Sequence, residues 1–139
     1  MSTRRTQWCN WMLLSSVLLL AFGYTDGTDC QKLRNGEFYY YSTPTRGRVE
    51  VKRQDSLQIE INPVTGDIVR SKIIWKNNCQ YTLYVNAFSL SKLSKMDSLL
   101  SVTPGEVVIT NITPRYYECK LTLKVFGKTF NKLDTIYIK

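Results

Sequence analysis

The dominant pattern in this chain is the alternation of apolar and polar residues in short segments separated by turn residues. Residues 48–53 read RVEVKR, and residues 57–61 read LQIEI. A period of two is typical of β-strands with one buried and one wet face, because successive side chains point to opposite sides. Similar segments recur along the chain at 37–42, 48–53, 57–61, 68–75, 79–88, 106–112, 116–126 and 129–138. The sequence therefore predicts an all-β fold.

Most of the connections between these segments are short, so consecutive strands are expected to pair antiparallel. Eight antiparallel strands in meander order favour a small up-and-down barrel or a strongly curled sheet. Closure is favoured because it removes the exposed edges of a sheet. A two-sheet sandwich is the alternative architecture.

One segment interrupts the alternation. Residues 88–105 place several leucines and Met96 at near-helical spacing. We predict one short amphipathic helix near residues 91–100, ending before Pro104. At the end of a barrel, such a helix serves either as a lid over the mouth or as a plug that completes the core. The plug is the simpler interpretation.

The turn between the fourth and fifth segments suggests a register. A three-residue loop at 76–78 would pair Trp75 with Cys79 and place the apolar residues of both strands on one face. Asn78 would then adopt the left-handed backbone conformation that such loops require.

The first 23 residues have the features of an export signal. Arg4 and Arg5 precede an apolar stretch at 12–22 that is too short to cross a bilayer as a helix. Small residues at Ala21 and Gly23 place the cleavage after Gly23; a membrane anchor is the alternative. We therefore expect an exported protein, periplasmic or secreted, consisting of a signal peptide at 1–23, an N-terminal tail at 24–35 and a single β-barrel domain at 36–139.

The charged residues argue against catalysis. Lys and Arg outnumber Asp and Glu by 19 to 11, and there is no His, which excludes Ser-His-Asp triads, Cys-His dyads and His-based metal sites. The basic residues alternate with apolar ones and are expected to face water, Arg53 among them. Glu50, Glu60, Asp67 and Glu118 are also expected on the outer face, exposed and unpaired. We expect no enzyme, no cofactor and no metal site.

Three cysteines remain after the predicted cleavage, at positions 30, 79 and 119. Export permits disulfides, and three thiols allow three pairings. In a meander barrel, Cys30 and Cys79 fall at the same end, whereas Cys119 lies within a strand and points inward. The topology favours a Cys30–Cys79 disulfide and leaves Cys119 as a buried thiol.

Five aromatic residues are candidates for lining a ligand cavity inside the barrel: Phe38, Tyr40, Trp75, Tyr81 and Tyr117. Such a cavity would suit a small apolar ligand. A barrel this small can instead be filled by its own side chains. The chain would then act through its outer surface, as an envelope interaction or inhibitor module with an acidic protein partner. We expect a monomer, no nucleic-acid partner and no stable membrane insertion.

Short motifs resemble two groups of proteins. A Gly-x-aromatic motif at Gly36-x-Phe38, after a short tail, resembles the opening of lipocalin-like barrels. A wider pattern resembles a group of small exported bacterial proteins of uncharacterised function: Cys30, Gly36-x-Phe38, Ile73-x-Trp75 and Cys79-x-Tyr81. That resemblance implies a β-rich exported domain and, because the two outer cysteines recur in the group, a Cys30–Cys79 disulfide. It implies no particular activity.

Overall fold

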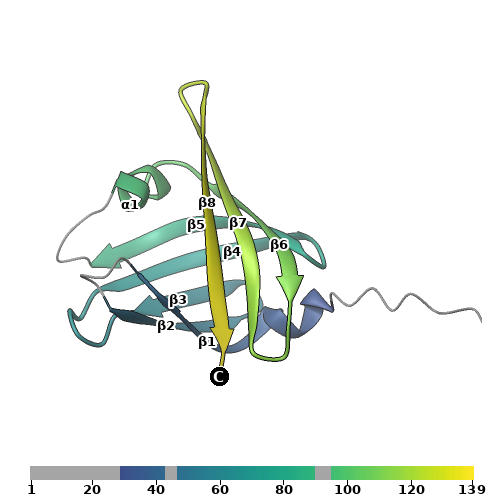
Figure 1. Ribbon diagram of the computed structural model, residues 1–139. Helices are drawn as coiled ribbons and strands as arrows, with labels where there is room; N and C mark the ends of the chain where they lie inside the picture. Colours follow the sequence, from purple (N-terminus) through teal and green to yellow (C-terminus); the bar gives the residue numbers. More distant parts are fainter. Residues whose placement is uncertain (1–28, 43–46, 90–94) are drawn as a thin grey trace, which may run out of the picture.

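A computed structural model describes residues 29–42, 47–89 and 95–139, so the predicted signal peptide lies outside the described residues. The described chain forms a closed barrel of eight antiparallel strands in meander order, which confirms the predicted fold class (Figure 1). The strands are β1 (Asn35–Tyr41), β2 (Arg48–Gln54), β3 (Leu57–Ile61), β4 (Ile68–Asn77), β5 (Gln80–Ser89), β6 (Gly105–Ile112), β7 (Tyr116–Val125) and β8 (Lys128–Ile138).

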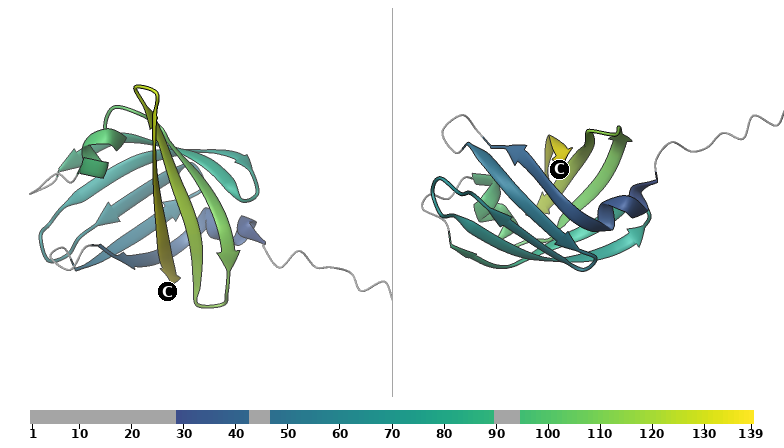
Figure 2. Two further views of the ribbon diagram at one scale, coloured as in Figure 1. Left: turned by 45° about the horizontal axis from the view of Figure 1, so that its top comes forward. Right: turned by 90° about the horizontal axis from the view of Figure 1, so that it is seen from below.

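The barrel is not evenly closed around its circumference. Strands β6 to β8 cross the direction of β2 to β5 steeply, as both views of the ribbon show (Figure 1, Figure 2). Only four residue pairs join β5 to β6, and only two join β1 to β8. The strands separate beyond these short ladders, which leaves space inside the barrel.

A short 3-10 helix, η1 (Cys30–Arg34), closes one end of the barrel, called here the lower end. The side chains of Cys30 and Leu33 in this helix are buried. Cys30 forms a disulfide with Cys79, which confirms the predicted pairing. Cys119 is a buried free thiol, as expected. The disulfide therefore fixes η1 across the lower end of the barrel, directly before β1 begins.

Gly36 explains why a glycine precedes the aromatic residue at the start of β1. Its φ is +145°, a conformation that residues with a side chain rarely adopt. A Cβ atom at this position would lie 3.1 Å from the ring of Phe38. The missing side chain lets the ring fold back over the backbone and seal the lower end.

The helix α1 (Lys95–Leu100) lies at the opposite, upper end, which confirms a short helix within the predicted range; residues 90–94 lie outside the described residues. None of its residues is fully buried. Gly105, where β6 begins, leaves space for α1 to pack against the barrel. A Cβ atom at this position would meet the side chain of Leu121 at 2.6 Å and that of Leu100 at 3.0 Å. In the part of the chain that the structure describes, no helix combines the length and apolar character needed to cross a bilayer.

The turn between β4 and β5 differs from the prediction. Trp75 pairs with Tyr81 rather than with Cys79, and the ladder is irregular between Trp75 and Asn77. The side chain of Asn77 accepts a hydrogen bond from the N–H of Cys79 at 2.9 Å. This contact holds the turn, and Asn78 does not have a positive φ. The shift of two residues leaves Trp75 on the predicted face.

Strand β3 faces the opposite way from the prediction. A two-residue turn joins β2 to β3 and pairs Arg53 with Gln58 and Val51 with Glu60. Directly paired residues share a face of the sheet, so Gln58 and Glu60 point inward with Val51. Arg53 also points inward and is 2% exposed, although we expected it to face water.

The other carboxylates also depart from the exposed, unpaired state that we expected. Asp67 is buried, at 7% exposure. Glu50 forms an ion pair with Arg48 at 2.8 Å. Glu118 is half-buried and accepts a hydrogen bond from the side chain of Asn111 at 3.3 Å. The contact of Glu50 lies within β2, whereas that of Glu118 joins β7 to β6.

Tyrosine rings on the outer surface reinforce the two-residue ladder between β1 and β8. Tyr137 stacks on Tyr39 at a centroid distance of 5.1 Å, and it meets Tyr41 and Tyr116 at 6.0 and 6.1 Å. Aromatic pairs of this kind stabilise a protein by about 0.5–1.5 kcal/mol each beyond the area they bury. This outer tyrosine cluster closes the seam from outside.

Replacement of Tyr137 by Ala is expected to lower the free energy of unfolding by about 2 kcal/mol, because three ring contacts at the seam are lost. Denaturant titration followed by circular dichroism measures the change. Tyr84→Ala on the outer face of β5 is the control, since no ring contact of Tyr84 is found among the described residues. Equal losses for the two variants would contradict a special role of the seam.

Candidate ligand-binding cavity

The interior of the barrel holds a cavity of about 670 Å³. The apolar part of its wall is formed by side chains from the strands and from α1, among them Val51, Leu83, Val107, Leu121, Ile136, Met96 and Leu100. The alternative of a barrel filled by its own side chains is therefore wrong. Because Met96, Asp97 and Leu100 line the upper part of this space, α1 forms a roof over the cavity and not a plug in a filled core.

Three of the five aromatic candidates line the cavity, namely Tyr40, Tyr81 and Tyr117. Phe38 is buried behind the wall, with its ring edge-on to Tyr117 at 5.8 Å. Trp75 packs on Tyr81 at 4.7 Å and donates a hydrogen bond to the carbonyl of Asp55 at 2.9 Å. These two residues support the tyrosines from outside the cavity. A ligand-binding role for the five remains a prediction.

Arg53 is the most unusual residue of the wall, since a buried charge normally requires several partners. Its Nη1 donates to the carbonyl of Leu33 at 2.8 Å. Its Nε and Nη2 both donate to Oε1 of Gln58, at 3.0 and 2.8 Å. Nη2 also approaches the hydroxyl oxygens of Tyr117 and Tyr81, at 3.0 and 3.2 Å. All of these partners are uncharged, so none of them neutralises the guanidinium directly.

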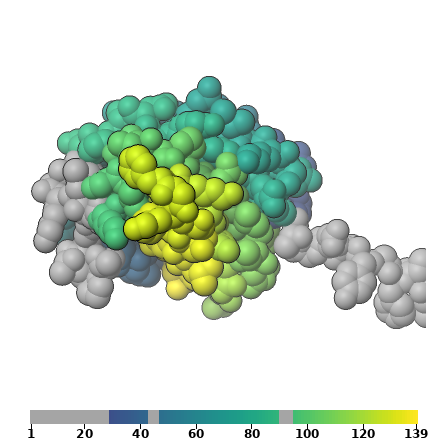
Figure 3. All heavy atoms as spheres, turned by 90° about the horizontal axis from the view of Figure 1, so that it is seen from above, coloured from purple at the N-terminus to yellow at the C-terminus, as the bar shows by residue number. Residues whose placement is uncertain are grey.

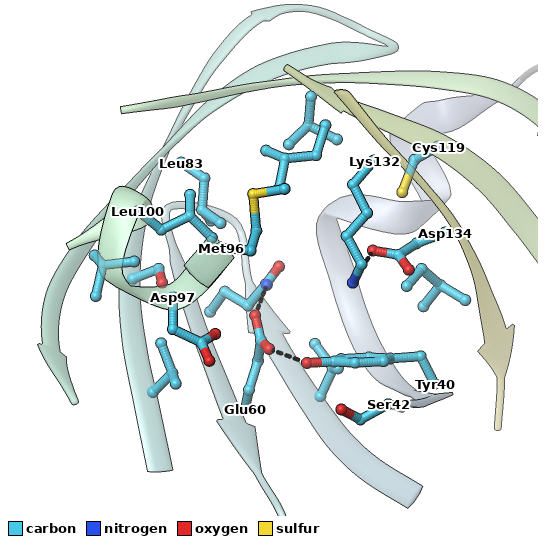
Figure 4. A pocket seen from close by; sticks show the side chains of 18 of the residues that line it. Tyr40, Ser42, Glu60, Leu83, Met96, Asp97, Leu100, Cys119, Lys132 and Asp134 are labelled. Carbon is cyan, nitrogen blue, oxygen red and sulfur yellow. Dashed lines mark hydrogen bonds and ion pairs between the residues drawn. The ribbon is translucent and has the colours of Figure 1, made fainter. Parts of the chain in front are cut away.

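The amide of Gln58 connects the guanidinium to a carboxylate. Gln58 accepts from Arg53 through its oxygen and donates through Nε2 to Oε1 of Glu60 at 2.7 Å. The other oxygen of Glu60 accepts a hydrogen bond from the hydroxyl of Tyr40 at 2.7 Å, as the dashed line in Figure 4 shows. This Arg53–Gln58–Glu60–Tyr40 chain, called the polar relay below, places a cation and an anion inside the barrel without direct contact.

The phenols of the cavity remain protonated at neutral pH. Burial raises the pKa of Tyr117 to about 12, against the opposing charge of Arg53. Burial likewise raises the pKa of Tyr81 above its ordinary value. The pKa of Tyr40 is also raised, first by burial and then by the negative charge of Glu60. All three hydroxyls therefore keep a hydrogen that they can donate.

A second pair of charges lies on the β8 side of the cavity. Lys132 and Asp134 form an ion pair at 2.7 Å, and the ammonium of Lys132 stands 5.8 Å from the centre of the Tyr40 ring. Figure 4 shows this pair beside Tyr40, facing Glu60 and Asp97 across the cavity. In the space-filling view from above, the yellow residues of β8 lie beside the green residues around α1 (Figure 3).

Cys119 lines the cavity as a thiol with little reactivity. Burial, and next the negative charge of Asp134, raise its pKa to about 12. At pH 8 the thiolate is therefore roughly one molecule in ten thousand. We expect iodoacetamide to modify this cysteine very slowly in the native protein and rapidly in denaturant, as measured by mass spectrometry over time. Rapid native modification at pH 8 would contradict the burial of this thiol.

Sequence reasoning missed the polar relay, although signals for part of it were present. Arg53 has the same strand parity as Val49 and Val51, which places it on the inner face. The two-residue turn after β2 then puts Gln58 and Glu60 on that face as well. The predicted alternation was correct in period, and the turn determines which face is buried.

Comparison with protein-family models, curated proteins and solved structures finds no match to the chain. Among residues 29–42, 47–89 and 95–139, no three metal-ligating side chains gather in a way that would hold an ion. The candidate site therefore has to be interpreted from its own chemistry.

Proposed function

We propose that this chain is an exported, non-enzymatic, lipocalin-like barrel that holds a small, mainly apolar molecule in its interior. The observation that carries the proposal is the cavity of about 670 Å³ with a largely apolar wall. Cavities of about 300–1,000 Å³ with a few polar groups are typical of small-molecule sites. The polar relay supplies polar groups of this kind inside the barrel, and its hydrogen bonds hold its side chains in fixed orientations.

Export is supported by two features. The first 23 residues have the pattern of a signal peptide. The Cys30–Cys79 disulfide is a bond that persists in oxidising compartments and is rare in the cytosol. A periplasmic or secreted location follows from the proposal, and cell fractionation of the tagged chain tests it.

Binding of diphenylhexatriene, a hydrocarbon dye that fluoresces in apolar surroundings, tests the proposal. We expect saturable binding of one dye per chain. Val85 lines the cavity, and its replacement by Trp should fill that space and weaken dye binding about tenfold or more. Tyr84→Trp is the matched control, because Tyr84 lies one residue away on the outer face and is 39% exposed.

A lack of dye binding by the parent chain would overturn the proposal. Equal dye affinities of the Val85→Trp and Tyr84→Trp variants would show that the dye binds outside the cavity, with the same consequence. Circular dichroism of both variants separates loss of binding from loss of fold.

An interaction module acting through the outer surface is the second candidate. Phe126, in the tip that joins β7 to β8, is fully exposed, and Leu133 on β8 is 77% exposed. Exposed apolar side chains mark protein contacts where they form a contiguous patch. A pull-down with the parent chain and with Phe126→Ser tests this alternative, and loss of a specific partner in the variant would favour it.

A further inference from the structure

Three hydroxyl groups on the cavity wall have hydrogens without an acceptor. Ser71 is 0% exposed, and its Oγ has no hydrogen-bond partner. The hydroxyl oxygens of Tyr81 and Tyr117 accept from Arg53, but neither hydroxyl donates to an acceptor among the described residues. A buried polar group without a partner costs about 1–3 kcal/mol, so native proteins seldom leave one unused. Ser71 is such a group, and each of the two phenols keeps a hydrogen that a polar atom of a bound molecule could accept.

The three hydroxyls belong to one region of the wall. Ser71 on β4 pairs with Gln58 on β3, and Gln58 pairs with Arg53 on β2. The hydroxyls of Tyr81 and Tyr117 both contact the guanidinium of Arg53. Side chains of directly paired residues lie about 5 Å apart, so Ser71 lies beside Gln58, and Gln58 lies beside the guanidinium that the two phenols contact. A single acceptor group placed there can reach more than one of them.

The charges of the cavity are already balanced. Its wall carries three basic and three acidic residues, namely Arg53, Lys95, Lys132, Glu60, Asp97 and Asp134. Lys132 is paired with Asp134, and Arg53 is connected to Glu60 through Gln58. A ligand with a charged head would add an unbalanced charge beside a mainly apolar wall, which is unfavourable. The head group that fits is an uncharged acceptor.

We propose that the ligand is an uncharged amphiphile whose polar end carries a carbonyl oxygen, as in an ester, a ketone or an amide. The carbonyl oxygen, with its two lone pairs, accepts one hydrogen bond from Ser71 and one from Tyr81 or Tyr117. The hydrocarbon part extends toward Met96 and Leu100 beneath α1. This inference rests on the proposed function and names the chemical class of the molecule that the cavity takes.

Three probes with the same hydrocarbon chain and different heads test the class: methyl laurate, lauric acid and dodecylamine. Each is titrated below its solubility limit or micelle-forming concentration against the protein loaded with diphenylhexatriene, and loss of dye fluorescence gives its affinity. We expect the ester to bind at least about tenfold more tightly than the acid or the amine. Tightest binding of the acid would show an unbalanced positive charge in the cavity, and tightest binding of the amine would show an unbalanced negative charge. Either result, or equal affinities, overturns the inference.

The variant Ser71→Ala tests the site itself. It removes one donor to the carbonyl, so the affinity for methyl laurate should fall about fivefold to tenfold. The affinity for the dye, a pure hydrocarbon, should not change. The melting temperature should not fall, because Ser71 has no partner to lose. Ser89→Ala, at an exposed position of β5, is the matched control.

The two proposals fail in different ways. If the parent chain binds no dye, the ligand-holding function fails, and the head-group inference fails with it. If the dye binds but Ser71→Ala leaves the ester affinity unchanged, only the assignment of the carbonyl site is overturned.

Discussion

Replacement of Arg53 by Met is expected to lower the free energy of unfolding by about 3–5 kcal/mol, more than any other single substitution of a charged residue in the barrel. Arg53 is 2% exposed, and its guanidinium donates hydrogen bonds to the Leu33 carbonyl and to the Gln58 side-chain oxygen. Met is apolar and of similar length, so both acceptors would be left buried without a donor. The negative charge of Glu60 would also lose the cation that Gln58 connects to it.

Denaturant titration measures this loss, and Lys52→Met is the matched control. Lys52 is adjacent in β2 but exposed, and it contributes only a surface ion pair with Glu37 at 3.3 Å. Such a pair stabilises a protein by less than about 1 kcal/mol. The double variant Arg53→Met with Gln58→Leu should lose less than the sum of the two single variants, because donor and acceptor are removed together. Additive losses would contradict a coupled relay.

Removal of the disulfide is the second large effect. Cys30 and Cys79 are separated by 49 residues along the chain. A bridge over a loop of this length restricts the unfolded chain, and its loss is expected to lower the free energy of unfolding by about 4 kcal/mol. The barrel would also lose the contact that holds η1 across its lower end.

The double variant Cys30→Ser with Cys79→Ser tests this expectation, again by denaturant titration. A reductant should lower the stability of the parent chain to that of the variant and leave the variant unchanged. A parent chain that keeps its stability after complete reduction would show that packing of Leu33 and Phe38 alone closes the lower end.

The order of the strands and their approximate limits followed from the sequence because period-two alternation is a local signal. Strand β3 was predicted with its true bounds, 57–61. The disulfide followed from topology, since a meander brings the tail and the start of β5 to one end. The strand limits depend only on residues that are close along the chain, and the disulfide depends only on the order of the strands around the barrel.

The site was not predictable in the same way. Alternation gives the period of β3 but not the face that is buried, and the apolar residues of LQIEI suggested the wrong face. The Asp55-Ser56 turn sets the register between β2 and β3, and this register places Gln58 and Glu60 on the inner face. The cavity depends on how far β1 and β8, and β5 and β6, separate beyond their short ladders. That separation is a property of the whole barrel, which local patterns do not contain.

Native mass spectrometry of the purified chain tests the central claim, that the barrel is hollow and holds one molecule. The protein is mixed with increasing methyl laurate and, in parallel, the Val85→Trp variant is treated in the same way. The account predicts one adduct per parent chain, lost on denaturation and strongly reduced in the variant. A bare chain mass at every concentration, or equal adducts on both proteins, would contradict it.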